Sequence, residues 1–214
     1  MSVNKINYQR ELDRIIADNQ RRGTVPKLLL HVCCAPCSSY CLEYLSNYFD
    51  ITVYYYNPNI SFEEEYEYRL SEEKRFISLK EFSRPVALTE SEYCPEDFFA
   101  AVKGLEQEPE GGLRCRACFR LRLEATAKKA KEGGFDCFTT TLTISPLKDA
   151  RLLNAIGMEL GAREGVKWLC SDFKKKDGYK RSCELSAQYG LYRQDYCGCV
   201  FSRRERDERL SRET

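Results

Sequence analysis

The stretch at residues 28–39 constrains the fold most strongly, because an apolar run typical of a buried strand ends abruptly in three closely spaced thiols. The thiols are Cys33, Cys34 and Cys37, and a proline and two serines typical of a first helical turn lie among and after them. In a parallel sheet, the carboxyl end of such a strand opens into the ligand crevice, where helix amides favour anions and thiolates. The stretch therefore predicts a strand-to-helix turn with chemistry at its tip.

Short apolar runs alternate with helical patterns along the rest of the chain. Strands are expected at residues 27–32, 51–56, 85–88, 135–141 and 166–169. Helices are expected at residues 7–22, 38–47, 62–82, 95–105, 115–131, from about 147 onward, and 201–212. Repeated alternation of this kind indicates an α/β fold with a mostly parallel sheet and flanking helices.

A chain of 214 residues is long enough for one well-buried core, so we expect a single domain over residues 1–214. It would comprise an N-terminal helix in residues 1–26, an α/β core in residues 27–170 and a C-terminal segment in residues 171–214. The C-terminal segment contains a Cys-Gly-Cys sequence and a basic run at residues 174–181, which is expected to form turns.

Composition narrows the functional classes. The formal net charge is +1, so charge alone argues neither for nor against a nucleic-acid partner. The amino terminus lacks an apolar signal core, and no apolar stretch approaches the length of a membrane span, so we expect a cytoplasmic protein with no membrane partner. Twelve cysteines in that reducing compartment indicate metal binding or redox work rather than a disulfide framework.

The cysteines nearest the chemistry fall into three groups. They are Cys33-Cys34-x-x-Cys37 with Cys41 one turn later, Cys115-x-x-Cys118, and Cys197-Gly198-Cys199. Two Cys-x-x-Cys spacings are typical of zinc or iron sites, because both thiolates can reach one centre from a helix start. Adjacent thiols diverge from the backbone, which favours an iron–sulfur cluster or two metal centres over a tetrahedral zinc site. A zinc site that holds the loops together is the alternative.

Cys197 and Cys199 are separated by one residue, so a disulfide between them would be strained and easily reduced. This favours a redox-cycling pair, and a pair of metal ligands is the alternative. The isolated cysteines Cys94, Cys137 and Cys170 are expected to be small buried hydrophobic residues.

Two further features surround the thiols. His31 is the only histidine, and we expect a hydrogen-bonded core residue rather than a catalyst, in a position from which it could orient a metal ligand or tune a cluster potential. Positive charges and tyrosines gather near the second and third cysteine groups and would suit phosphates and bases of an RNA loop, although a solvated surface is the alternative. They are Arg114, Arg116, Arg120, Arg122, residues 174–181, Tyr179, Tyr189, Tyr192 and Tyr196.

Six motifs in order resemble the QueH family of epoxyqueuosine reductases, which act in tRNA queuosine biosynthesis. The motifs occupy residues 31–36, 56–60, 114–119, 141–146, 172–175 and 192–199. The resemblance implies an oxidoreductase that reduces the epoxide of epoxyqueuosine at the tRNA wobble position to the alkene of queuosine, with release of water. It also implies an HUP-like architecture, similar to the adenine nucleotide alpha hydrolases.

The resemblance further implies a 4Fe-4S cluster. Its ligands by motif would be Cys33, Cys34, Cys115 and Cys118, and Cys197 with Cys199 would form a redox-active pair. Some family members carry Asp at the position of Cys37, where an additional iron would bind beside the cluster. A thiolate can also bind iron, so Cys37 is either a metal ligand or a group on the substrate side.

The implied partners are a tRNA with a GUN anticodon carrying epoxyqueuosine and an external electron donor such as ferredoxin or flavodoxin. Asp172, Asp177 or a tyrosine near the site would supply protons.

Two other functions compete with epoxyqueuosine reduction. A zinc-stapled RNA-binding module would need only the metal and the basic patches. An ATP-dependent tRNA-modifying HUP enzyme would need a glycine-rich phosphate loop where this chain has Cys-Cys-Ala-Pro-Cys-Ser.

Overall fold

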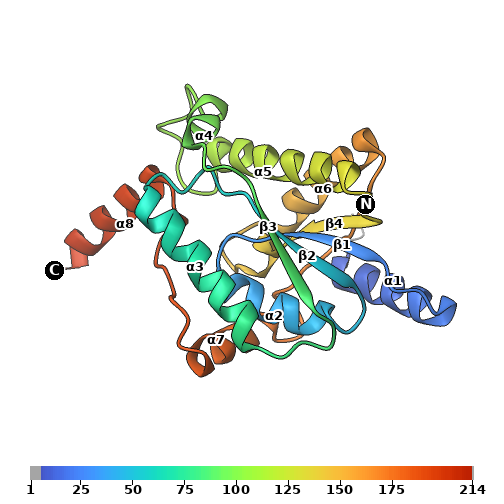
Figure 1. Ribbon diagram of the computed structural model, residues 1–214. Coiled ribbons are helices and arrows are strands. Elements are labelled where there is room, and N and C mark those ends of the chain that lie inside the picture. The colour runs from blue at the N-terminus through green and yellow to red at the C-terminus, as the bar shows by residue number, and fades with distance from the viewer. Residues whose placement is uncertain (1–5, 214) are drawn as a thin grey trace.

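The computed structural model describes residues 6–213 and is organised around a five-stranded sheet in the order β3-β2-β1-β4-β5 (Figure 1). The strands are β1 (Lys27–His31), β2 (Asp50–Tyr55), β3 (Val86–Glu90), β4 (Cys137–Thr140) and β5 (Lys167–Trp168). Every pair of neighbouring strands is parallel. The predicted α/β class with a mostly parallel sheet is confirmed, and the strand order agrees with an HUP-like, doubly wound arrangement.

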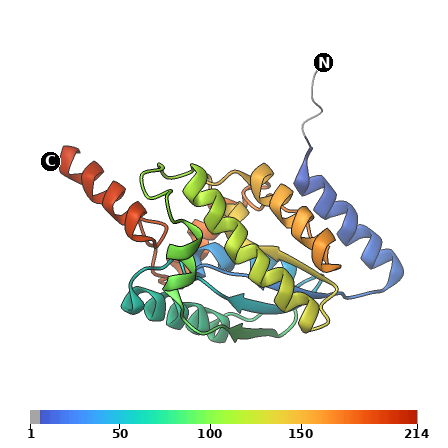
Figure 2. The same ribbon diagram turned by 90° about the horizontal axis from the view of Figure 1, so that it is seen from above.

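Helices cover both faces of the sheet (Figures 1 and 2). They are α1 (Tyr8–Arg22), α2 (Ala35–Leu45), α3 (Glu63–Leu79), α4 (Pro95–Ala101), α5 (Leu113–Glu132), η1 (Thr141–Ile144, a 3₁₀ turn), α6 (Ala150–Glu164), α7 (Gly178–Gln188) and α8 (Val200–Glu213). Helices α5 and α6 lie on one face, whereas α1, α2, α3 and α7 lie on the other. Across residues 6–213, no helix combines the length and apolar character needed to cross a membrane.

The two faces are separated by side-chain alternation along β1. Leu28 and Leu30 pack into the cluster formed with α1 and α2, whereas Leu29 packs against α5 and α6. All three leucines are fully buried, as expected of a strand covered by helices on both sides. The central strand is therefore fixed from two sides, which holds the loop after it in place.

The strand and helix expectations agree with the structure to within a few residues, with one exception. The turn predicted over residues 174–181 is wrong from Gly178 onward, because α7 begins there. Ser182 and Leu185 are buried on α7, and this helix packs on α2. An Asp-Gly pair inside a basic run strongly favours a turn. The apolar face of α7 is short, so its helical periodicity is weaker than this turn preference.

Gly157 on α6 allows an unusually close approach between this helix and β5. A Cβ atom at this position would clash with the indole ring of Trp168. The indole is held in place because its Nε1 donates a hydrogen bond to Asn154 Oδ1 at 2.9 Å. The contact leaves no room for a methyl group, so glycine is required here for packing.

Gly157→Ala should therefore destabilise the protein by about 1–3 kcal/mol, as expected for an overpacked core. In an unconstrained helix the same change would stabilise by about 1 kcal/mol, so the sign of the effect is diagnostic. Urea unfolding of the variant, with the exposed neighbour Met158→Ala as control, measures it. A gain in stability for Gly157→Ala would contradict the packing.

Glu73 joins α3 to α2 beneath the thiol-bearing loop. The residue is fully buried, and its Oε2 accepts a hydrogen bond from Ser38 Oγ at 2.7 Å. Its Oε1 is buried and has no hydrogen-bond partner. Burial disfavours the carboxylate and raises the pKa of Glu73 from 4.5 to about 8.

Because the folded chain holds this proton up to about pH 8 and the unfolded chain releases it near pH 4.5, stability should fall as pH rises between these values. The slope attributable to Glu73 reaches up to about 1.4 kcal/mol per pH unit. Glu73→Gln should remove this slope, whereas the exposed Glu64→Gln should keep it. Urea unfolding across this pH range tests the prediction, and equal slopes in the two variants would refute it.

Candidate active site

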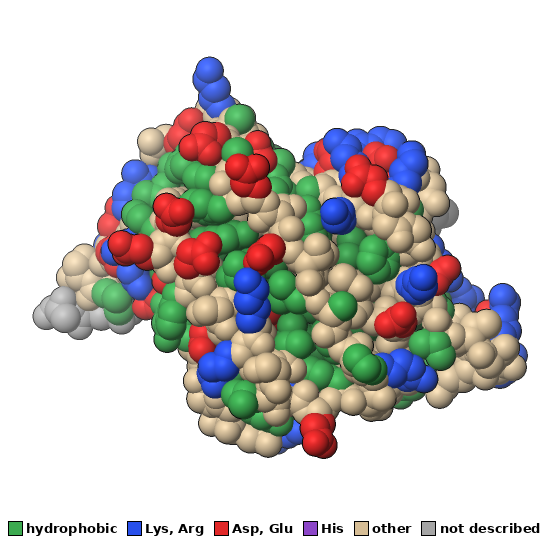
Figure 3. Space-filling view, in the orientation of Figure 1, with side chains coloured by type: hydrophobic (Ala, Val, Ile, Leu, Met, Phe, Trp, Pro, Cys, Tyr) green, Lys and Arg blue, Asp and Glu red, His purple; other side chains and the backbone are tan. Residues whose placement is uncertain are grey.

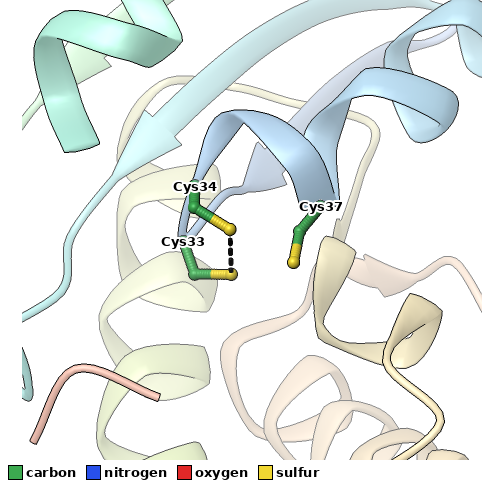
Figure 4. Close-up of side chains that lie close together, drawn as sticks. All are labelled: Cys33, Cys34 and Cys37. Atoms are coloured by element: carbon green, nitrogen blue, oxygen red, sulfur yellow. Dashed lines mark hydrogen bonds between the residues drawn. The ribbon is translucent and has the colours of Figure 1, made fainter. Parts of the chain in front are cut away.

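Three thiols meet at the carboxyl end of β1 (Figure 4). Cys33 and Cys34 lie in the loop after β1, and Cys37 lies in the first turn of α2. The three sulfur atoms all lie within 4.8 Å of one another, and the Sγ atoms of Cys33 and Cys34 are 3.7 Å apart. We call Cys33, Cys34 and Cys37 the β1 thiol cluster. It lies next to the point between β1 and β4 where the strand order reverses, which is the usual ligand position in such sheets.

The local backbone explains why the thiols converge. Cys34 is extended at the N-cap of α2, and its carbonyl accepts the amide hydrogen bonds of Cys37 and Ser38, each at 3.1 Å. Pro36 occupies the first turn, where its fixed φ suits a helix start. The turn thus directs the Cys37 side chain back toward the two thiols that precede the helix.

The cluster favours one thiolate. Hydrogen bonds from Cys34 and Cys37 lower the pKa of Cys33 well below its usual value, and the nearby Lys148 and Arg122 lower it further. The pKa of Cys34 rises to about 12, because its proton is shared with Cys33 and the site is buried. A cysteine set that readily yields a thiolate is suited to binding a soft or borderline metal ion.

Four more cysteines gather where α5 begins and α8 begins, and we call them the α5–α8 thiol group. They are Cys115, Cys118, Cys197 and Cys199. Their thiols interact electrostatically with one another, and burial raises the pKa of Cys118 to about 12. Among the described residues, none of these four belongs to the set whose ligand atoms lie within 4.8 Å of each other. All twelve cysteines are free thiols in the structure.

The Cys-Gly-Cys loop is held from α3. Arg69, itself 2% exposed, donates hydrogen bonds to the carbonyls of Tyr196 at 3.4 Å and Cys197 at 3.2 Å. Gly198 has φ +121°, which side-chain-bearing residues rarely adopt, and a Cβ there would lie 3.0 Å from Ile60. The loop is thus fixed by a buried arginine and by a backbone conformation that only glycine takes easily.

A cavity of about 430 Å³ connects the two thiol sets. Its thiols are Cys33, Cys37 and Cys197, its cationic residues are Arg122, Lys148, Arg193, Arg206 and Arg209, and its acidic residues are Glu110, Asp195 and Glu205. Arg206 is neutralised by Asp195 and Asp207. Lys148 and Arg209 form no ion pair with any described residue. The cavity therefore combines reactive sulfur with an excess of positive charge.

The predicted proton donor Asp172 lies outside the residues that line this cavity. Its carboxylate accepts a hydrogen bond from Lys174 Nζ at 2.6 Å, and the same ammonium donates to the carbonyl of Thr143. Asp177 does not line the cavity either, whereas Tyr179 and Tyr196 do. The structure thus leaves the role of Asp172 a prediction and brings two tyrosines to the site.

His31 supports the site from inside the fold. It is fully buried, with Nδ1 2.8 Å from Thr140 Oγ1 and Nε2 3.2 Å from the carbonyl oxygen of Tyr56. Burial lowers its pKa to about 3, so the imidazole is neutral near pH 7. It therefore links the ends of β1, β2 and β4, with its one N–H donating from Nε2 to the Tyr56 carbonyl.

The isolated cysteines differ from one another. Cys137 is buried as expected, but Cys94 and Cys170 are only half-buried, so the expectation of burial is wrong for these two. Cys94 precedes α4 and Cys170 follows β5. Both lie at element ends, where packing is incomplete, and neither lines the cavity.

The arginines flanking the second cysteine pair do not form the surface patch that the sequence suggested. Arg114 and Arg122 are each 1% exposed. Arg114 pairs with Glu205 of α8 at 2.7 Å and stacks on Phe201, so it fastens α8 to α5. Arg120 forms an ion pair with Glu159. Helical periodicity places these side chains on different faces of α5, and two of those faces are covered.

Several residues that shape the site were not among those predicted from the sequence. Gln194 Nε2 donates a hydrogen bond to Cys34 Sγ at 2.7 Å, and Lys148 lines the cavity beside three thiols. Arg69 was recognisable in principle, because it and Glu73 share a helical face with the apolar residues Tyr66 and Leu70. Nothing local to Gln194 or Lys148 distinguishes them from surface residues.

The chain is similar to one family of known proteins over most of its length. The family model described as epoxyqueuosine reductase QueH matches residues 28–205. The chain is 48% identical to the QueH epoxyqueuosine reductase of Staphylococcus epidermidis, covering 94% of this chain and 87% of that protein. It is 46% identical to the Streptococcus pyogenes protein of that name, covering 92% and 78%, and 38% identical to the Thermotoga maritima protein, covering 89% and 97%.

The family match includes the β1 thiol cluster, the cysteine pair at the start of α5 and the Cys-Gly-Cys loop, which are the segments that carry the clustered cysteines. The sequence motifs, the cavity and the similarity over nearly the whole chain lead to one assignment. The chain belongs to the QueH family of epoxyqueuosine reductases.

Proposed function

We propose that this protein reduces the epoxide of epoxyqueuosine at the wobble position of a tRNA with a GUN anticodon, giving queuosine. The single observation that carries the proposal, beyond family membership, is the cavity in which Cys33, Cys37 and Cys197 lie beside an excess of cationic residues. The reaction takes up two electrons and two protons, and it converts the epoxide to an alkene and water. A tRNA substrate places this reaction in the cytoplasm.

The charge distribution supports an RNA partner. Acidic side chains gather over α4 and the start of α3 (Figure 3), where Glu63, Glu64, Glu65, Glu96 and Asp97 lie. A polyanion would be repelled from that face and attracted to the cationic cavity. Helix α8 projects from the body (Figures 1 and 2), and its arginines begin at the cavity. They are Arg203, Arg204, Arg206, Arg209 and Arg212.

Aromatic side chains at the cavity suit an unpaired base. The guanidinium groups of Arg69 and Arg206 lie 5.2 Å and 5.0 Å from the centroid of the Tyr196 ring, which holds its orientation. Tyr179 is 40% exposed on the cavity wall. Proteins commonly bind single-stranded RNA loops by stacking bases on such rings, and the cavity volume is within the usual range for a small ligand.

The residues present fit a thiolate-held metal. The β1 thiol cluster offers three sulfur atoms within 4.8 Å of one another, one of them readily ionised. We propose a 4Fe-4S cluster with Cys33, Cys34, Cys115 and Cys118 as ligands, and Cys37 as ligand to an additional iron. Such a centre would supply electrons and a Lewis acid for the epoxide oxygen. Gln194 would hold the Cys34 sulfur by its hydrogen bond.

Cys197 and Cys199 are proposed as the redox-active pair. Oxidation of two thiols to a disulfide releases two electrons and two protons, which are the numbers that the epoxide consumes. Cys197 lines the cavity, and Cys199 Sγ accepts the amide hydrogen bond of Ser202 at 3.3 Å at the start of α8. An external ferredoxin or flavodoxin would then reduce the disulfide, and Asp172 is proposed to relay protons through its partner Lys174.

Cys33→Ala should abolish turnover, because it removes both a proposed ligand and the thiolate of the cluster. We expect a loss of at least about 100-fold. The measurement is anaerobic reaction of epoxyqueuosine-containing tRNA with a chemical reductant, followed by nucleoside mass spectrometry. Cys183→Ser on α7, which does not line the cavity, is the matched control and should react like the unmodified protein. Full activity of Cys33→Ala, or a zinc-loaded, iron-free active protein, would contradict the proposal.

Cys197→Ser and Cys199→Ser should each block turnover while the protein keeps its iron and its visible absorption, because these residues are proposed as a redox pair and not as ligands. Iron analysis and absorption spectra of the anaerobically reconstituted variants test this. Loss of iron from either variant together with loss of activity would instead identify the Cys-Gly-Cys loop as part of the ligand set.

A further inference from the structure

Arg122 on α5 is a buried cation without a carboxylate partner. Its side chain is 1% exposed, yet it lines the cavity beside Cys33 and Cys197. The Nε atom donates to the carbonyl of Cys118 at 3.4 Å, and the guanidinium lies 5.7 Å from the centroid of the Phe119 ring. Its Nη2 atom is buried and has no hydrogen-bond partner, and no carboxylate among the described residues pairs with it.

An isolated buried charge is costly, and folded proteins compensate such charges with ions of opposite sign or metals. The groups that surround Arg122 are thiols from both sets: Cys33 of the β1 thiol cluster, and Cys115, Cys118 and Cys197 of the α5–α8 thiol group. Once ionised, these thiols are the groups of residues 6–213 placed to balance the guanidinium.

We propose that Arg122 is a positioning residue that serves as the fixed counter-charge shared by the two thiol sets, and that it raises the reduction potential of the metal centre they hold. The inference rests on the proposed function, because it requires that centre. A thiolate-bound metal centre becomes more negative when it accepts an electron. A fixed positive charge in a low-dielectric surrounding stabilises the reduced state more than the oxidised one.

Arg122 is better placed for this role than the second cation of the cavity. Lys148 faces Cys33, Cys37 and Cys197 but is only half-buried on the loop before α6. Water and substrate phosphates can therefore screen Lys148, whereas Arg122 is shielded from both. Its unpartnered Nη2 also leaves one donor available for a sulfur acceptor.

The test compares the anaerobically reconstituted protein with Arg122→Gln, Arg122→Lys and Arg120→Gln. Arg120 lies on the same helix but is bound to Glu159 at the surface, so it controls for loss of an arginine from α5. For each protein we measure iron per chain and the midpoint potential of the metal centre. The potential comes from a dye-mediated titration followed by electron paramagnetic resonance. We expect a more negative potential for Arg122→Gln, and potentials near that of the unmodified protein for Arg122→Lys and Arg120→Gln.

If Arg122→Gln retains no iron, the Arg122→Lys variant is decisive. Iron retention in Arg122→Lys with an unshifted midpoint potential supports the counter-charge role. Loss of iron from both variants overturns it. An unshifted potential for Arg122→Gln overturns the inference. So does an equal shift for Arg122→Lys and Arg122→Gln, or a weakened affinity for tRNA with no change in potential. If the unmodified protein binds no iron, the proposed function is wrong, and this inference is wrong with it.

Discussion

Parallel pairing of β1 with both β2 and β4 is the interaction on which the rest of the structure depends. It aligns three strand ends at one edge of the sheet, where His31 contacts the side chain of Thr140 and the carbonyl of Tyr56. The buried leucines of β1 fix this edge from both faces. The loop after β1 consequently has little freedom, and the thiols that it carries meet at a defined place.

The placement of buried positive charges relative to the thiols is the second feature that defines the site. Three of the seven cysteines in the two thiol sets line the cavity, and Arg122 and Lys148 bring positive charge to it without a carboxylate partner in residues 6–213. Structural arginines surround this core: Arg69 holds the Cys-Gly-Cys loop, and Arg114 fastens α8. The fold therefore uses buried cations to join its segments, and the counter-charge proposed for Arg122 would give a buried cation a role in the chemistry as well.

Much of this could be predicted from the sequence. The alternation of strands and helices fixed the fold class, and the clustered cysteines identified the elements that border the site. Side-chain burial on α5 could not be predicted, because Arg114 and Arg122 look like surface arginines until α8 and the cavity are placed against them. Helix α7 was missed because its apolar face is short and becomes visible only when packed on α2. Gln194 and Lys148 reach the site through long-range contacts that no local pattern records.

A single-turnover experiment tests most directly whether this protein reduces epoxyqueuosine with its own thiols. Protein that has been reduced, freed of reductant and kept under anaerobic conditions is mixed with an excess of tRNA containing epoxyqueuosine, with no electron donor present. We expect queuosine in amounts up to one equivalent per chain, together with a disulfide between Cys197 and Cys199. If the reduced protein forms no queuosine, the proposal that this cavity reduces the epoxide is wrong.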